Sequence, residues 1–289
     1  MKKIILVALS LAVFIVAGCG GAPDDPEQDR KIVAYYNVQQ LSLSGTSSKS
    51  ETEEAENMVN RIIFYGIDRQ NTVSKLLTEQ NPTFGSTEIT VSQDILSIFA
   101  VANPSSGIEL ATPQNLADLT DMVAEFANMP ATPFIMSGIA VIFNNVANIE
   151  LIRTIAKIEF LPSSELVIET VTVTNTPNQG YVFGRGSAAV PPTASRISYP
   201  QIASATPIIY VAENTASDPT AFVVTGTFEG NPARYEIPFE IEKGVSSAIS
   251  RNTHYQIPIM PISEDACIVN ITVLPWNVVV TDAYEPDDD

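Results

Sequence analysis

Histidine, cysteine and paired carboxylates are the side chains that most often carry acid, base or nucleophilic chemistry. This chain of 289 residues has one histidine and two cysteines. The histidine, His254, stands in RNTHYQIPI at the head of a segment with alternating apolar residues, so we expect a half-exposed structural residue. The sequence has no G-x-S-x-G elbow of a serine hydrolase, and a usual zinc site needs three or four His or Cys ligands. The residues therefore predict no catalytic site, no metal site and no cofactor.

Acidic residues outnumber basic ones by 33 to 15, which gives a formal net charge of −18. Nucleic-acid binding needs a clustered Lys/Arg surface, so this balance argues against it. The carboxylates cluster at residues 51–56 and 287–289, in polar segments that we expect to be flexible. A glycosidase would need two carboxylates at a defined separation in a cleft. A secreted hydrolase is therefore the least supported class of function.

Cysteine chemistry of another kind is indicated at the N-terminus. Two lysines precede an apolar run, residues 4–17, which is short for a membrane span and typical of a signal-peptide core. The run ends in VAGC, which resembles the lipobox of bacterial lipoproteins. That resemblance implies cleavage just before Cys19 and acylation of its thiol, and a plain secretory signal is the alternative. Cys267 then has no partner for a disulfide, and we expect a small buried apolar side chain.

One basic residue, Lys49, stands in the polar stretch LSLSGTSSKSETEEAEN. The segment before it, residues 31–44, is rich in Val, Ile, Tyr and Leu, which favours an extended strand. The Gly, Ser, Thr and Glu residues that surround Lys49 could not fill a core. The stretch is either an ordinary linker or a place where the chain is cut and the strand before it is lost.

The elements that must position these residues are mainly strands. One helix is expected from Thr112-Pro113 to about residue 128, because apolar residues follow this start at helical spacing. Turn residues separate the strands at intervals typical of a β-sandwich. Residues 89–103 are expected to form one or two strands, and residues 133–143 a hairpin or a buried strand. Further strands are expected at residues 61–68, 151–161, 165–175, 179–185, 206–213, 221–230, 234–242, 254–262 and 267–280. We predict an all-β fold with one or two short helices and two β-sandwich (transthyretin-like) domains in tandem.

The last of these strands alternates clearly, with Val269, Ile271 and Val273 on one side. Trp276, the only tryptophan of the chain, follows a proline near the end of the strand. We expect a buried packing anchor at this position, and an exposed aromatic residue that binds carbohydrate is the alternative.

Several stretches occur in the same order as in the FimA/Mfa-type fimbrillins, the type V pilins of Bacteroidales, which this chain resembles. The lipobox comes first, followed by a strand and a basic site in a polar segment. The later matching stretches are ENMVNRIIFYGID, SIFAVANP, the LADL helix, PFIMSG, LIRTIAKIEF, IIYVAEN, SRNTHYQIPI and ITVLPWNV. Their order extends over nearly the whole chain.

The resemblance implies a mechanism of assembly at the bacterial outer membrane and cell surface. Members of the family are exported as lipoproteins and cut by a trypsin-like protease, which releases the lipidated N-terminus with its first strand. The cut leaves an apolar groove, which C-terminal strands of a neighbouring copy or a related pilin subunit fill. Repetition of this step builds a filament with a role in adhesion.

Carried over to this sequence, the resemblance assigns lipidation to Cys19 and proteolytic processing to the bond between Lys49 and Ser50. The removable strand is residues 31–44, and the donor strand is Ile268–Val280. The donor residues of that strand are Ile268, Val269, Ile271, Val273 and Trp276. Most family members are cut after Arg, so a Lys at the processing site is a departure from the family pattern.

The expected organisation has four parts. Residues 1–18 form the signal peptide, and residues 19–49 form the lipidated tether with the removable strand. Residues 51–148 form the first sandwich, and residues 149–289 form the second with the donor strand and an acidic tail. The leading interpretation is a shaft or tip subunit. The alternative is a fimbrial anchor, or a surface-anchored lipoprotein that keeps its lipid and binds a host or bacterial ligand through its loops.

Overall fold

The computed structural model describes residues 29–38, 51–82, 85–202 and 207–276. Within these residues the helices are α1 (Glu51–Asn57), α2 (Ser106–Leu110) and α3 (Leu116–Thr120). The strands of the first half are β1 (Asp29–Val38), β2 (Arg61–Asp68), β3 (Val73–Gln80), β4 (Gly85–Ser92), β5 (Ile95–Ala102), β6 (Val123–Glu125), β7 (Met136–Val141) and β8 (Val146–Arg153). The strands of the second half are β9 (Ile155–Pro162), β10 (Leu166–Pro177), β11 (Gln179–Tyr181), β12 (Arg196–Ile202), β13 (Ile208–Ala212), β14 (Ala221–Phe228), β15 (Asn231–Pro238), β16 (Thr253–Pro261), β17 (Cys267–Val269) and β18 (Thr272–Pro275).

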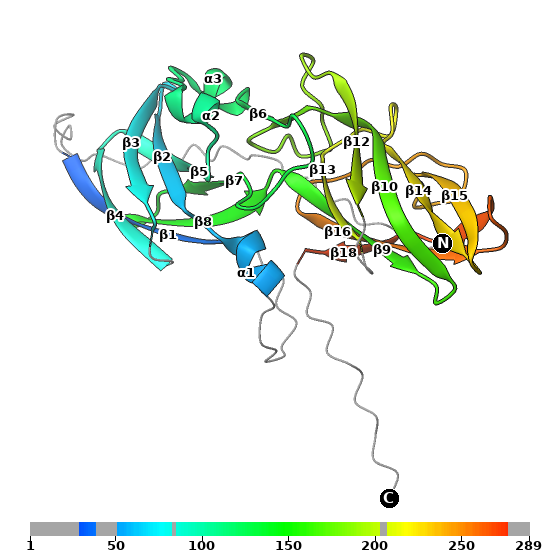
Figure 1. Ribbon diagram of the computed structural model, residues 1–289. Helices are drawn as coiled ribbons and strands as arrows, with labels where there is room; N and C mark the ends of the chain where they lie inside the picture. The colour runs from blue at the N-terminus through cyan, green and yellow to red at the C-terminus, as the bar shows by residue number, and fades with distance from the viewer. Residues whose placement is uncertain (1–28, 39–50, 83–84, 203–206, 277–289) are drawn as a thin grey trace, which may run out of the picture.

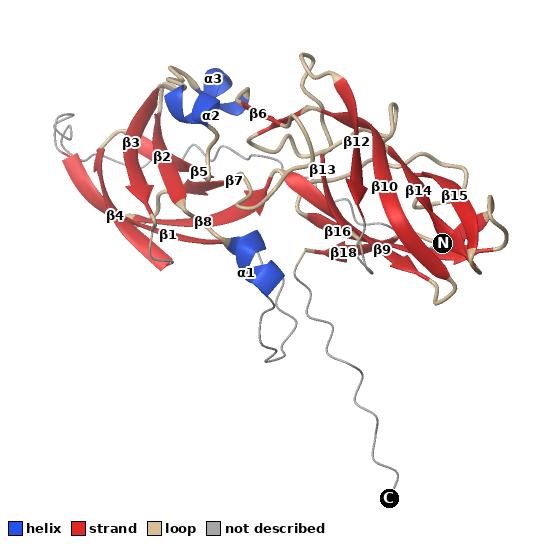
Figure 2. Cartoon of the chain, viewed as in Figure 1, coloured by secondary structure: helices blue, strands red, loops and turns tan. Residues whose placement is uncertain are grey.

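The predicted all-β fold is confirmed, with three short helices where one or two were expected (Figure 2). Figure 1 shows two lobes side by side, the first built from β1–β8 and the second mainly from β9–β18. None of the helices in the described ranges is long and apolar enough to cross a membrane.

The first lobe is built on one sheet with the strand order β3-β2-β5-β7-β8-β1-β4. The sheet closes on a single core, because side chains from strands near both ends of this order pack together. Ile62 and Phe64 of β2 contact the same core as Ile32 of β1 and Ile89 of β4. Strands that are far apart in the sheet therefore form two opposing layers, as in a sandwich.

Helices α2 and α3 cover the outer side of β2 and β5. Ile108 of α2 and Leu119 of α3 are buried against Tyr65 and Phe99. Both faces of β2 are thus covered, which accounts for the almost continuous apolar run RIIFYGI in a single strand.

The second lobe is a two-layer sandwich. One layer has the order β12-β10-β14-β15, and the other has the order β13-β9-β16-β17, with β18 also paired to β16. Alternate residues of both layers fill the core between them, as Val171 and Phe222 do on one side and Ile158 and Ile257 on the other. The prediction of a β-sandwich is therefore confirmed here in its simplest form.

The helix expected from residue 112 to residue 128 is much shorter. Helix α3 is capped at Asn115, whose side chain accepts a hydrogen bond from the backbone N–H of Asp118. The chain then turns into β6, where Val123 pairs with Tyr181 of β11. Pairing with a strand that lies later in the sequence overrides the helical spacing of the apolar residues.

Other boundaries also differ from the sequence analysis. Residues 151–161, expected as one strand, belong to β8 and β9, which lie in different sheets. No strand was expected between residues 185 and 206, where the structure has β12, and Pro200 is tolerated there because β12 is an edge strand. Strand β3 was not expected, since its exposed and half-buried residues do not alternate.

Gly226 provides a test of the second sandwich. It lies in β14 beside a register irregularity in β10, and a Cβ atom at this position would lie 1.9 Å from the carbonyl oxygen of Val167. We expect Gly226→Ala to lower the free energy of unfolding by about 1–3 kcal/mol, because the neighbouring backbone would have to move. Urea unfolding followed by circular dichroism measures this change.

Gly107→Ala is the matched control, because a Cβ atom at Gly107 in α2 would meet no other atom within 4 Å. This variant should unfold at the same urea concentration as the native sequence or at a slightly higher one. Equal stability of the two variants would contradict the close approach of β10 and β14.

Candidate functional site

Strand β1 is an interior strand of the first sheet. It pairs antiparallel with β4 along Asp29–Tyr36 and parallel with β8 along Val33–Val38. Alternate side chains of β1 point into the core and are between 0% and 4% exposed. These side chains are Ile32, Ala34, Tyr36 and Val38. The strand therefore fills a complete slot in both the hydrogen-bond ladder and the core.

Polar side chains at the start of β1 contact the nearby strands β4 and β5. The side chain of Arg30 donates to the carbonyl oxygen of Ile95 over 2.7 Å, and Lys31 forms an exposed ion pair with Glu88. Loss of β1 would expose the unpaired edges of β4 and β8 together with an apolar trench, which is unfavourable in water. A strand of suitable side chains could restore both.

Three of the predicted site residues, Cys19, Lys49 and Ser50, lie outside the described residues. The described elements on either side of the expected cut are β1, which ends at Val38, and α1, which begins at Glu51. The sequence order alone thus places the expected cut between the interior strand and the first helix.

The predicted donor segment lies along β16 of its own chain. Val269 in β17 pairs with Ile259, and Val273 in β18 pairs with Tyr255. Ile271 is buried in this segment, whereas Val273 is 46% exposed. The strand is interrupted between β17 and β18, but both pair with β16 in the same register, so Val269 and Val273 still lie on the same side of the segment.

Trp276 is buried at 2% exposure, which confirms the expected packing anchor. Its ring is stacked on Tyr210 with the centroids 6.0 Å apart and meets the ring of Phe134 edge to face. The guanidinium of Arg153 lies 4.7 Å from the centroid of the indole. The indole N–H donates to Glu56 Oε2 over 2.8 Å, so the polar atom of the ring is also satisfied.

Glu56 is the centre of this cluster, and the expectation that it lies in a flexible acidic segment is wrong. Glu56 lies near the end of α1 and is 0% exposed. Besides the bond from Trp276, its Oε1 accepts from Lys157 Nζ over 2.8 Å and from the hydroxyl of Tyr210 over 2.7 Å. The cluster was not predictable from spacing, because Glu56 and Trp276 are 220 positions apart.

Arg153 ties the same cluster to both lobes. Its Nε donates to the backbone carbonyl of Glu56 over 3.2 Å, and its other nitrogens donate to the side-chain oxygens of Asn57 and Asn252. Burial lowers the pKa of Arg153 to about 10, so the side chain stays charged at neutral pH. The guanidinium of Arg153 therefore contacts both the backbone carbonyl of Glu56 and the ring of Trp276.

The ionisation of Glu56 follows from its partners. Burial raises the pKa of this carboxyl group, but the positive charge of Lys157 and the hydrogen bonds from Lys157, Tyr210 and Trp276 outweigh burial and lower the pKa below its ordinary value. Conversely, burial and the nearby carboxylate raise the pKa of Tyr210, so its hydroxyl remains a donor. The carboxylate is thus ionised at neutral pH inside the protein.

The structure supports a structural role for His254. Its Nε2 lies 3.0 Å from Glu159 Oε2, and burial lowers the pKa of the imidazole. Cys267 is half-buried against the second core, and burial raises the pKa of its thiol. In the described ranges, no group of three or more His, Cys, Asp or Glu residues is arranged to hold a metal ion.

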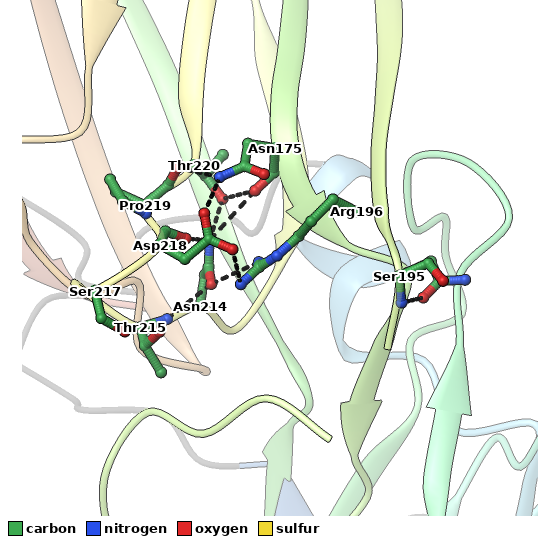
Figure 3. A network of polar contacts seen from close by, with 10 residues as sticks. Asn175, Ser195, Arg196, Asn214, Thr215, Ser217, Asp218, Pro219 and Thr220 are labelled. Atoms are coloured by element: carbon green, nitrogen blue, oxygen red, sulfur yellow. Dashed lines mark hydrogen bonds and ion pairs between the residues drawn. The ribbon is translucent and has the colours of Figure 1, made fainter. Parts of the chain in front are cut away.

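A second polar network lies in the second lobe, and Figure 3 shows it from close by. Asn214 is buried and accepts from Arg196 over 2.9 Å, while its amide donates to the hydroxyl of Thr220 over 2.8 Å. Asp218 accepts from Asn175 and forms an ion pair with Arg196. The contacts join β10, β12 and the loop after β13 to one another, so the network fixes a loop and resembles no ligand site.

An apolar groove of about 920 Å³ lies where the two lobes meet. Ile139 and Ile152 line it from the first lobe, and Leu274 and Trp276 line it from the C-terminal segment. Phe183 contributes a further apolar side chain. The end of the described chain is therefore beside a groove that both lobes share.

Glu56 gives a pH-dependent test of the cluster. Because its pKa is lower in the folded protein than in the unfolded chain, the ionised carboxylate stabilises the fold above about pH 4.3. This stabilisation is lost as the pH falls through the folded-state pKa. We expect Glu56→Gln to lower the free energy of unfolding at pH 7 by about 3–5 kcal/mol, because Lys157 would keep a buried charge without its partner.

Urea unfolding at pH 7 and at pH 3 measures this difference, which should shrink at the lower pH. Glu88→Gln is the control, because the ion pair of Glu88 with Lys31 is exposed and screened by solvent. A pH-independent difference between Glu56→Gln and the native sequence would argue against the ionised carboxylate.

The chain matches no protein-family model and no curated protein sequence. It is similar in structure to the tip fimbrial protein Mfa3 of Porphyromonas gingivalis with a C-terminal truncation, with a TM-score of 0.59 and 15% identity over 86% of this chain and 100% of that one. A fimbrial assembly protein of Parabacteroides distasonis ATCC 8503 gives a TM-score of 0.56 and 12% identity over 86% and 100% of the two chains. The fimbrial anchor protein Mfa2 of Porphyromonas gingivalis gives a TM-score of 0.50 and 14% identity over 86% and 98%.

These identities are low, while the similarity extends over nearly the whole length of the solved chains. The similarity therefore concerns the fold. This chain has the fold of solved fimbrial proteins, in agreement with its resemblance to the FimA/Mfa-type fimbrillins.

Proposed function

We propose that this chain is a member of the FimA/Mfa-type fimbrillins and serves as a structural subunit, in the shaft or at the tip, of a cell-surface fimbria. It is exported as a lipoprotein acylated at Cys19 and is not an enzyme. A trypsin-like protease trims it at Lys49, and the mature subunits polymerise by exchange of a C-terminal strand. The observation that supports this most is the interior position of β1, whose removal alone would open a groove.

The position of β1 in the sequence fits removal by one cut. A break after Lys49 would separate β1 from every later element, because β1 ends at Val38 and α1 begins at Glu51. The four buried side chains of β1 would leave a trench between β4 and β8. An incoming strand with apolar residues at alternate positions would restore the ladder and the core.

The polymer follows from the geometry of such a contact. The slot that β1 would leave between β4 and β8 belongs to the first lobe, whereas the donor segment belongs to the C-terminal end of the chain. The two contact surfaces therefore differ. Contacts between different surfaces are head-to-tail and propagate as an open fibre. The partners of the chain are then further copies or related pilin subunits, with adhesion as the function of the assembled fibre.

A second candidate is a fimbrial anchor or a surface lipoprotein that keeps its lipid and binds a ligand through its loops. Lys49 favours it, since most members of the family are cut after Arg. One solved protein with this fold is a fimbrial anchor protein. In this case β1 stays in place, and the slot between β4 and β8 remains filled.

The N-terminus of the protein on its native cell surface distinguishes these two functions. We expect intact-mass spectrometry to show a chain that begins at Ser50 and has no lipid, because the cut removes the acylated tether. A chain that begins at acylated Cys19 would instead support the anchor or the binding lipoprotein.

Substitution at the cut adds a causal test. Lys49→Ala should leave a folded, uncut chain that forms no polymer, whereas Lys49→Arg should be cut and should polymerise. Lys243→Ala, in an exposed turn of the second lobe, is the matched control and should behave as the native sequence. Polymers formed by an uncut Lys49→Ala chain would rule out strand removal as the trigger.

A further inference from the structure

The cluster at Glu56 joins four parts of the chain that are far apart in sequence. Glu56 belongs to α1, Arg153 to β8, Tyr210 to β13, and Trp276 follows β18. In Figure 1, α1 lies on the lower side of the molecule, near the place where the two lobes meet. The cluster therefore sits where the start of the mature chain and its C-terminal segment come together.

Three kinds of contact hold Trp276 in this cluster. One ring face stacks on Tyr210, the guanidinium of Arg153 lies within 4.7 Å of the ring centroid, and the N–H is bonded to Glu56. Release of the ring would expose a large apolar side chain. It would also leave a buried carboxylate without one of its three donors, which is unfavourable because a buried acceptor needs its partners.

The residues just before Trp276 are held less firmly. Val273 is 46% exposed, and β18 is a short strand that, among the described strands, pairs with β16 alone. Ile271 is the nearest preceding residue that is buried. The contacts of Trp276 are thus the strongest attachment near the C-terminal end of the described chain.

We propose that Glu56, Arg153 and Tyr210 form a clasp that keeps Trp276 in its own subunit, so that the strand donated to a neighbour begins after this residue. The inference rests on the proposed function and revises the donor segment predicted from sequence, Ile268–Val280. All the members of the clasp follow Ser50 in the chain, so the expected cut at Lys49 removes none of them. The clasp persists in the mature subunit and fixes the point from which the donated segment leaves.

The length of the chain beyond the clasp is sufficient for this role. The sequence after Trp276, NVVVTDAYEPDDD, has 13 residues, which span at most about 45 Å when extended. Strand β1 has 10 residues, or about 35 Å on the same scale. Trp276 also lines the apolar groove shared by the two lobes.

The fluorescence of Trp276 reports the clasp directly, because the chain has no other tryptophan. The purified full-length chain is cut with immobilised trypsin, and emission and acrylamide quenching are recorded before the cut, after it and in polymers. We expect a blue-shifted emission maximum and weak quenching in all three states. A red shift with stronger quenching in polymers would overturn the clasp while leaving strand exchange intact.

Truncation after Trp276 tests where the donated segment begins. The truncated chain should fold with the same emission and quenching as the full chain, should be cut, and should fail to act as a donor. If it polymerises as the full chain does, the donor does not begin after Trp276. If the cut full-length chain itself forms no polymer, both strand exchange and the proposed donor boundary are wrong. The fluorescence of variants then still tests whether the clasp holds Trp276.

Glu56→Gln tests the clasp by fluorescence alone. We expect a red shift of the Trp276 emission and a several-fold increase in quenching, because the anionic acceptor of the indole N–H is lost. Glu88→Gln, with its exposed ion pair, should leave both unchanged. Should Glu56→Gln fail to fold, Tyr210→Phe removes one donor to the same carboxylate and should give a smaller shift in the same direction. Native-like emission and quenching in a folded Glu56→Gln chain would overturn the role of the carboxylate.

Discussion

A strand in the interior of a sheet must satisfy hydrogen-bond donors and acceptors on both edges and fill a row of the core as well. Strand β1 does this between β4 and β8, with its alternate side chains completely or almost completely buried. An edge strand could leave at little cost, but an interior strand leaves a gap that water fills poorly. The proposed assembly depends on this constraint, because the gap gives a neighbouring strand its binding energy.

The cores of the two lobes differ in whether they depend on β1. The second lobe is a sandwich whose core is complete within the described chain, so it can serve as a rigid support. The first lobe closes its core only with β1 in place. Between them, the ionised Glu56 links α1 to the C-terminal segment through donors from Lys157, Tyr210 and Trp276. A buried charge with fixed donors favours one arrangement of the lobes over others.

The strands of the second lobe were the most predictable part of the fold. In β14 and β16, alternating apolar residues face a single core, and the sequence period records this directly. The pattern was less informative where pairing with distant residues decides the structure. The segment around Val123 joins β11 although its apolar residues have helical spacing, and β12 keeps Pro200 because it lies at an edge. Glu56 looked like part of a solvated acidic run, since its partners lie about 100 or more positions away in the sequence.

The neighbours of β1 have a consequence for the polarity of any replacement. Strand β4 is antiparallel to β1 and β8 is parallel to it, so β4 and β8 run in opposite directions. Any strand placed between them makes one parallel and one antiparallel ladder, whichever way it points. Backbone hydrogen bonding between β4 and β8 therefore hardly distinguishes the two directions of an incoming strand. The sizes of the alternate side chains must then set this direction, through a row that in β1 reads Ile32, Ala34, Tyr36 and Val38.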